Sequence, residues 1–177
     1  GSFKSVLMSF EHSIWFIQSG GVAVIIDTEE KTSASLVRAM MYRLTPEQRK
    51  RLIYMRPKSM EEAQQMVSYY KERAAKILEL PLHQQFPLYV SWDSLTGSDT
   101  EAAQEKVAKE GNAAEKGYSG AASSISKYYK SLVFDKSLLT IAHVQHAKKS
   151  MDPNALGDDQ LVAGGGDEPR FKSSYHF

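Results

Sequence analysis

The sequence predicts an α/β protein in which a mostly parallel sheet is covered by helices on both faces. Two patterns indicate this fold. Continuous apolar runs, which mark strands buried on both faces of a parallel sheet, occupy residues 21–27, 88–93 and 138–144. Between them lie segments whose apolar residues recur at every third or fourth position, as in amphipathic helices. Such an alternation is typical of parallel sheets built from strand–helix–strand units.

The expected elements alternate between helix and strand along the chain. Gly20 and Gly21 end the first helix, and a Thr-Pro-Glu turn at 45–47 precedes a short strand. Ser59, followed three residues later by Glu62, predicts a capping box at the start of the longest helix. The expected helices are 4–18, 33–43, 60–79 and 120–133, and the expected strands are 21–27, 52–55, 88–93 and 138–144.

Two segments do not fit this alternation. Residues 97–118 are polar and rich in Ala, Glu and Lys, which suits an exposed helix with loose ends. Residues 147–169 contain Gly, Asp and Pro, and a loop this long in a compact domain is usually functional or disordered. We expect residues 1–177 to form a single domain. Because the chain begins in a loop-like motif and ends on a strand-like stretch at 173–177, we expect a fragment truncated at both ends.

Composition limits the classes of function. The 177 residues suffice for one sizeable core, and 42% hydrophobic and 24% charged content is ordinary for a globular protein. Without cysteine, disulfides, thiolate zinc sites and cysteine nucleophiles are excluded. A net charge of +1 favours no partner by itself. No apolar run reaches the roughly 18 residues of a membrane span, so no membrane partner is expected, and no signal peptide is recognisable.

Polar residues at expected element ends could form a phosphate and metal site. Lys4-Ser5 opens a helix, as do the lysine and hydroxyl of a phosphate-binding loop. Asp93 ends a buried strand, where a carboxylate can hold magnesium. Glu29 follows the strand at 21–27 and could polarise an attacking water. Taken singly, each also fits an ordinary capped helix, a turn aspartate or a solvated loop.

Two further polar residues are expected at the same edge. Gln145 and His146 follow the strand at 138–144, so an amide and an imidazole there could sense a phosphate. His143 lies one residue deeper and is expected to be a core or interface histidine and not a ligand. No carboxylate or cysteine stands at ligand spacing beside the histidines, so we expect no metal site from them.

The C-terminal loop combines cations, glycines and an aromatic residue. That combination suits a segment that orders on a nucleic-acid backbone. Acidic residues in the same loop weaken the argument, and a solvated loop fits the composition equally well. The residues expected to contact nucleic acid are Lys148, Lys149, Gly164, Gly165, Gly166, Arg170 and Phe171.

In their order along the chain, these motifs resemble the ATPase core of RecA-type recombinases, in particular the phage recombinases related to UvsX. Ser2-Phe3-Lys4-Ser5 resembles the end of the phage Walker A loop, in which Phe also precedes the lysine. Asp27-Thr28-Glu29 resembles the strand-end Asp-x-Glu of the family, and Asp93-Ser94 resembles its Walker B ending. The resemblance covers nearly all of the chain.

The second half of the chain carries the more specific resemblance. Val144-Gln145-His146 is similar to the phosphate-sensing strand end of the family. Gly165-Gly166 followed by Arg170-Phe171 is similar to the end of its second DNA-binding loop, where a basic-Phe pair couples neighbouring subunits. The resemblance assigns 97–118 to the region of the first DNA-binding loop and 147–169 to the second.

The chain departs from the family pattern at several points. Trp92 replaces a small aliphatic residue of the Walker B strand, and Leu36 stands where an adenine-stacking tyrosine is expected. The resemblance therefore implies phosphate binding without the usual stacking on the base. The start of Walker A, the polymerisation segment before it and everything after Phe177 are missing from the match.

The resemblance implies an ATP-dependent strand-exchange recombinase. Such a protein binds single-stranded DNA as a helical filament, pairs it with homologous double-stranded DNA and hydrolyses ATP in the cytoplasm of a bacterial or phage-infected cell. ATP and Mg²⁺ are the implied cofactors. The implied roles are nucleotide binding by Ser2, Phe3, Lys4, Ser5, Asp93 and Ser94, metal binding by Ser5 and Asp93, and catalysis by Glu29, Gln145 and His146.

Two alternatives remain open at this point. A hexameric replicative helicase is built on the same RecA-like core. The second alternative is a non-catalytic filament or accessory module, because the Walker A loop is incomplete and the isolated chain could lack activity.

Overall fold

The computed structural model has a four-stranded, all-parallel sheet with the strand order β2-β1-β3-β4. The structure describes residues 3–30, 32–95, 99–101, 104–105, 117–132, 137–145, 147–149 and 161–163. The predicted fold class, a parallel sheet flanked by helices, is confirmed within these residues. The strands are β1 (Val22–Asp27), β2 (Leu52–Met55), β3 (Leu88–Asp93) and β4 (Leu139–Val144).

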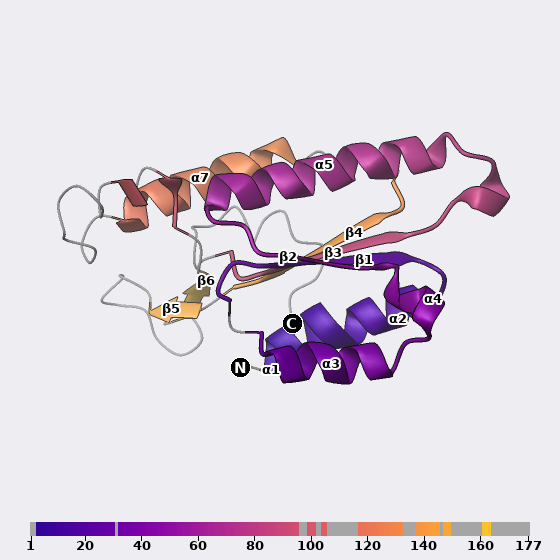
Figure 1. Cartoon of the computed structure of the whole chain (residues 1–177). Helices are drawn as coiled ribbons and strands as arrows, with labels where there is room; N and C mark the ends of the chain where they lie inside the picture. Colours follow the sequence, from indigo (N-terminus) through magenta and orange to yellow (C-terminus); the bar gives the residue numbers. More distant parts are fainter. Residues whose placement is uncertain are drawn as a thin grey trace.

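Helices cover both faces of the sheet. In Figure 1, α5 and α7 lie along one face, and α1, α2 and α3 lie along the other. The helices are α1 (Phe3–Ser5), the π-helix η1 (Val6–Glu11), α2 (His12–Gln18), α3 (Ala34–Tyr42), α4 (Pro46–Arg49), α5 (Met60–Leu78), the 3₁₀ helix η2 (Leu82–Gln84) and α7 (Gly117–Ser131).

The core lies on both faces of the sheet because successive side chains of each strand point to opposite sides. In β1, Val24 and Ile26 belong to the cluster beneath α5 and α7, whereas Ala23 and Ile25 belong to the cluster beneath η1, α2 and α3. All four side chains are buried. This double burial explains why the strand is an unbroken apolar run.

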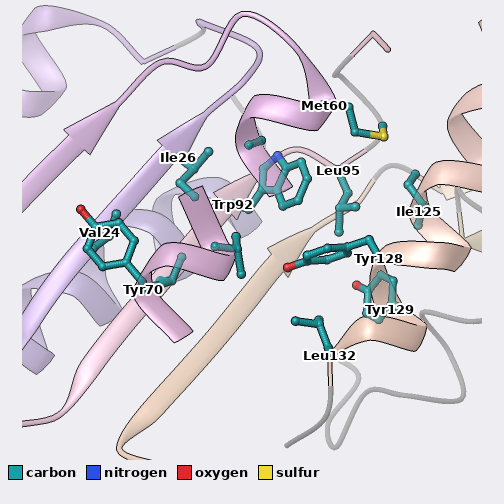
Figure 2. Close-up of a cluster of buried hydrophobic side chains, with 13 residues drawn as sticks. Val24, Ile26, Met60, Tyr70, Trp92, Leu95, Ile125, Tyr128, Tyr129 and Leu132 are labelled. Carbon is teal, nitrogen blue, oxygen red and sulfur yellow. The ribbon is translucent and has the colours of Figure 1, made fainter. Parts of the chain in front are cut away.

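Trp92 shows how the first of these clusters is packed. Its indole is fully buried and meets the ring of Tyr128 edge-on, with the centroids 5.4 Å apart. Figure 2 shows Trp92 among side chains of the sheet, α5 and α7. The bulky residue therefore fills space that α7 encloses. Its Nε1 finds no hydrogen-bond partner among the described residues, which typically costs about 1–3 kcal/mol.

The first helix differs from the prediction, which expected one continuous helix over 4–18. A π-helical stretch, η1, separates α1 from α2. Side chains bond to its backbone here: the Tyr89 hydroxyl donates to the carbonyl of Met8 at 2.5 Å, and Ser13 Oγ donates to that of Ser9 at 2.7 Å. These bonds satisfy buried carbonyls where the helix departs from the α-helical pattern.

Helix starts also differ from the predictions. Ser59 Oγ accepts a hydrogen bond from the amide of Glu62 at 3.1 Å. The Glu62 carboxylate accepts a hydrogen bond from the amide of Lys58 and so does not complete a capping box with Ser59. A complete capping box forms instead between Thr45 and Gln48, in the segment predicted to be a turn. Helix α7 begins at Gly117, before the predicted start at 120.

No helix in the described part of the chain is both long and apolar enough to span a membrane.

Candidate functional site

The carboxyl ends of the central strands bring two aspartates side by side. In the register of the sheet, Asp27 at the end of β1 pairs with Asp93 at the end of β3. Asp93 in turn pairs with Val144 at the end of β4, and Gln145 follows directly. Ligands of open α/β sheets bind outside these ends, so this edge is the candidate functional site.

The segment after β1 is bonded to the end of β3. Ser94 Oγ donates to Glu29 Oε1 at 2.6 Å, and Thr28 Oγ1 donates to the carbonyl of Ser94 at 2.8 Å. The amide of Thr28 also donates to the carbonyl of Asp93 at 2.9 Å. The peptide between Asp93 and Ser94 is cis. These bonds hold the Glu29 carboxylate beside the end of β3.

Lys4 reaches the same edge from the start of the chain. Its Nζ donates to the carbonyl of Gln145 at 3.4 Å, although the two residues are 141 positions apart. The Lys4 side chain is exposed, and Ser5, next to it on α1, is partly buried. Figure 1 shows α1 at the end of the sheet where the strands finish. An exposed ammonium is therefore available near the strand ends that carry the carboxylates.

The side chain of Gln145 is directed toward α7. Its Nε2 donates to the hydroxyl oxygen of Tyr129 at 3.3 Å. Burial raises the pKa of Tyr129, and the bond from Gln145 opposes that rise only in part. The phenol is therefore neutral at physiological pH. Gln145 thus joins the site edge to α7 by its side chain and to Lys4 by its carbonyl.

Asp27 is the most buried carboxylate of this edge, with only 3% of its surface exposed. The Tyr54 hydroxyl donates to Asp27 Oδ2, and the amide of Thr32 donates to the same oxygen at 3.2 Å. Burial, with a smaller contribution from the Asp27 carboxylate, raises the pKa of Tyr54. Tyr54 was not among the predicted site residues, because only the pairing of β2 with β1 brings its hydroxyl to Asp27.

His143 is partly buried among aromatic rings, which agrees with the prediction of a core or interface histidine. Its ring lies near those of Trp92, Tyr128 and Tyr129, and the Tyr128 hydroxyl and His143 Nε2 are 2.9 Å apart. Burial lowers the pKa of His143 to about 3, so the imidazole is neutral at physiological pH. The residue therefore contributes packing and a hydrogen bond to the fold.

Ser5 and Asp93 carry oxygen atoms of the kind that could hold magnesium together with phosphate. Among the described residues, no three His, Cys, Asp or Glu side chains are grouped as metal ligands. Mg²⁺ usually takes one or two carboxylates and completes its coordination with water and substrate phosphates. A hydroxyl from Ser5 and a carboxylate from Asp93 would suffice for that mode of binding.

The described part of 97–118 is attached to the start of α5. The amide of Met60 donates to the carbonyl of Asp99 at 3.0 Å, and Gln104 Nε2 donates to the carbonyl of Lys58 at 2.6 Å. Thr100 is buried. Glu101, Gln104 and Glu105 are helical and exposed, as predicted, so the buried Thr100 is the departure from the expected exposed helix.

The predicted loop at 147–169 contains a two-stranded antiparallel ribbon. β5 (Ala147–Lys149) pairs with β6 (Leu161–Ala163), so Lys148 and Lys149 lie on a strand where a loop was expected. Phe3 lies on α1. The remaining predicted site residues lie outside the described residues: Ser2, His146, Gly164, Gly165, Gly166, Arg170 and Phe171.

Comparison with protein-family models found no match, and comparison with curated proteins found no significant similarity.

Proposed function

We propose that this chain is the ATPase core of a RecA-type recombinase that binds ATP and Mg²⁺, assembles on single-stranded DNA as a filament and pairs it with double-stranded DNA. One observation carries the proposal. Lys4, Glu29, Asp93 and Gln145 come from four separate segments and meet at one edge of a parallel sheet. A lysine, a strand-end carboxylate and a second carboxylate are the groups that phosphoryl transfer to water requires.

The nucleotide-binding roles follow from charge and position. The exposed ammonium of Lys4 neutralises phosphate charge, and Ser2 and Phe3, which precede it in the sequence, contact the nucleotide beside it. Ser5 and Asp93 hold Mg²⁺ through oxygen atoms. When bound, ATP and Mg²⁺ supply the phosphoryl group that is transferred and the charge that the site senses.

Glu29 is the proposed general base. Its carboxylate accepts the hydroxyl of Ser94 through Oε1, and an ionised carboxylate, which accepts several hydrogen bonds through two oxygen atoms, can orient a water molecule. Ser94 therefore acts on the base, in place of the nucleotide contact that the sequence suggested. Because both residues are at least partly buried, the bond also keeps the carboxylate from turning away.

The route from nucleotide to DNA begins at Gln145. Gln145 and His146 respond to the γ-phosphate, and β5 follows them at once in the chain. Lys148 and Lys149 on β5, together with Arg170 and the glycines that follow β6 in the chain, bind the phosphate backbone of DNA, while Phe171 couples neighbouring subunits. Nucleotide state thereby controls DNA affinity, and the protein acts in the cytoplasm of a bacterial or phage-infected cell.

Glu29→Gln in the protein containing this chain tests the proposal. The amide keeps the size of the side chain but cannot accept the proton of water. We expect ATP-dependent filaments on single-stranded DNA to form normally and ATP turnover to fall by about 100-fold or more. Turnover is measured by phosphate release and filaments by electron microscopy.

Glu30→Gln is the matched control, because Glu30 is exposed and adjacent. It should leave turnover unchanged. Normal turnover by Glu29→Gln would remove Glu29 from the catalytic role. Closed six-membered rings with DNA unwinding, in place of open filaments, would favour a replicative helicase. No nucleotide binding by the unaltered protein would favour a non-catalytic module.

A further inference from the structure

Asp27 has no role in the proposed reaction, yet it is the best-enclosed carboxylate of the site edge. Its Oδ2 accepts both the hydroxyl of Tyr54 and, at 3.2 Å, the amide of Thr32. A buried carboxylate is costly unless it is bonded in this way. The two donors come from different places: Tyr54 from β2, and Thr32 from beyond the end of β1. One oxygen atom thus joins two strands and the segment that follows.

Arg56 completes the same cluster from the end of β2. Its guanidinium lies over the Tyr54 ring, 5.4 Å from the centroid, and Nε donates to the Tyr54 hydroxyl oxygen at 3.4 Å. Nη2 donates to the carbonyl of Thr32 at 3.3 Å. Thr32 is therefore held at its amide by Asp27 and at its carbonyl by Arg56. The stacked guanidinium also restricts the Tyr54 ring to the orientation that reaches Asp27.

Glu29 lies between the two residues that this cluster fixes. Asp27 anchors the chain two residues before it, and Thr32 anchors the chain three residues after it. Between them, Glu30 has φ of 52°, in the left-handed region that costs energy for a side chain other than glycine. A backbone so bent persists only where its surroundings determine it. The hydrogen bonds of this cluster hold the backbone around Glu30 from the side of β2, and Ser94 bonds to Glu29 from the side of β3.

We propose that Asp27, Tyr54 and Arg56 form a clamp that positions Glu29. The clamp fixes the backbone on either side of Glu29, and Ser94 then orients the carboxylate. Its three members are positioning residues, since they act through Glu29. The catalytic part of this inference depends on the proposed function. The structural part, that the clamp orders the backbone around Glu29, does not.

Tyr54→Phe tests both parts, because it removes the hydroxyl donated to Asp27 and keeps the ring under Arg56. Hydrogen exchange of single amides, read by NMR, measures the order of the backbone. We expect the Thr32 amide to exchange about tenfold faster, with the amides in the middle of β1 unchanged. In ATP hydrolysis, kcat should fall by about five- to tenfold while KM for ATP stays within about twofold.

Two further variants sharpen the test. Tyr42→Phe is the control, because Tyr42 is 83% exposed on α3 and should change neither readout. Arg56→Gln alters an exposed side chain, so it should fold even if Tyr54→Phe does not. It should produce the same pattern with smaller changes, since the bond between Tyr54 and Asp27 remains.

Each outcome decides one part of the inference. Unchanged Thr32 exchange in both clamp variants would show that the cluster does not order this backbone, whatever the enzyme does. Faster exchange of the Thr32 amide with unchanged kcat would show that the clamp orders the backbone but that this order does not affect catalysis by Glu29. If the unaltered protein hydrolyses no ATP, the proposed function fails, and the exchange rates alone decide whether the clamp exists.

Discussion

At the scale of single residues, the bond between Ser94 and Glu29 is the most informative contact of the site. The sequence places Ser94 after a strand and Glu29 after another, but it cannot show that the two side chains meet. In the structure Ser94 is fully buried and donates to Glu29 Oε1 at 2.6 Å. A serine that the sequence assigned to the nucleotide thus bonds to the proposed base, because the sheet register brings the two strand ends together.

Ser94→Ala should therefore lower the rate of hydrolysis. Without the hydroxyl, the Glu29 carboxylate can turn, and kcat should fall by about tenfold while KM for ATP changes little. Steady-state kinetics measure both constants. Ser68→Ala, on the exposed face of α5, is the control. A large rise in KM at constant kcat would assign Ser94 to nucleotide binding instead.

At the scale of elements, the four strands of the parallel sheet were predictable, three of them from continuous apolar runs, whereas β5 and β6 were not. Helix details were less predictable. The π-helical stretch η1 coincides with the bond from the Tyr89 hydroxyl to the carbonyl of Met8, between residues 81 positions apart. The Thr45 capping box was missed because Thr-Pro also begins turns. Local sequence patterns cannot reveal a hydrogen bond between distant residues such as Tyr89 and Met8. The capping box, in contrast, could have been predicted from Thr45 and Gln48, which are three residues apart.

The junction between α2 and β1 depends on the absence of a side chain at Gly21. A Cβ there would lie 2.7 Å from the carbonyl oxygen of Pro87 and 3.0 Å from that of Phe16. Both atoms belong to the backbone, so neither can move without shifting the helix end or the start of β3.

Gly21→Ala should destabilise the fold by about 1–3 kcal/mol, the usual cost of forced overpacking. Urea unfolding followed by circular dichroism measures the loss. Ser19→Ala, at an exposed neighbouring position, should stay within about 0.5 kcal/mol of the unaltered protein. Equal stability of the two variants would mean that the junction tolerates a methyl group.

At the scale of the whole molecule, the meeting of the site residues at one sheet edge was predictable, because parallel strands carry their carboxyl ends to the same side. The sheet order was not, since nothing local specifies which strand pairs with which. The cluster around Asp27 also escaped prediction. Its members Tyr54 and Arg56 look like ordinary strand-end residues until β2 is placed beside β1.

The aromatic cluster that joins β3, β4 and α7 makes overall stability depend on pH through His143. Burial holds its pKa near 3 in the folded protein, against about 6.5 when unfolded. The unfolded chain therefore binds more protons between these values. His143 contributes its full stability above about pH 6.5, and that contribution is lost as pH falls toward 3.

His143→Gln should reduce this pH dependence. Between pH 6 and 4, the free energy of unfolding of the unaltered protein should fall by up to about 1.4 kcal/mol per pH unit more than that of the variant. Urea unfolding at several pH values gives the two slopes. His83→Gln, on exposed η2, should keep the original slope. Parallel slopes for all three proteins would show that His143 is not the titrating group.

The burial of Trp92 beside Asp93 has an optical consequence. The chain has two tryptophans, and the other, Trp15, is 64% exposed on α2. Trp15→Phe would leave one indole, shielded from water and covalently adjacent to the proposed magnesium ligand. Emission from that single fluorophore would report on the end of β3 with no added label, so the molecule carries its own spectroscopic probe of the site.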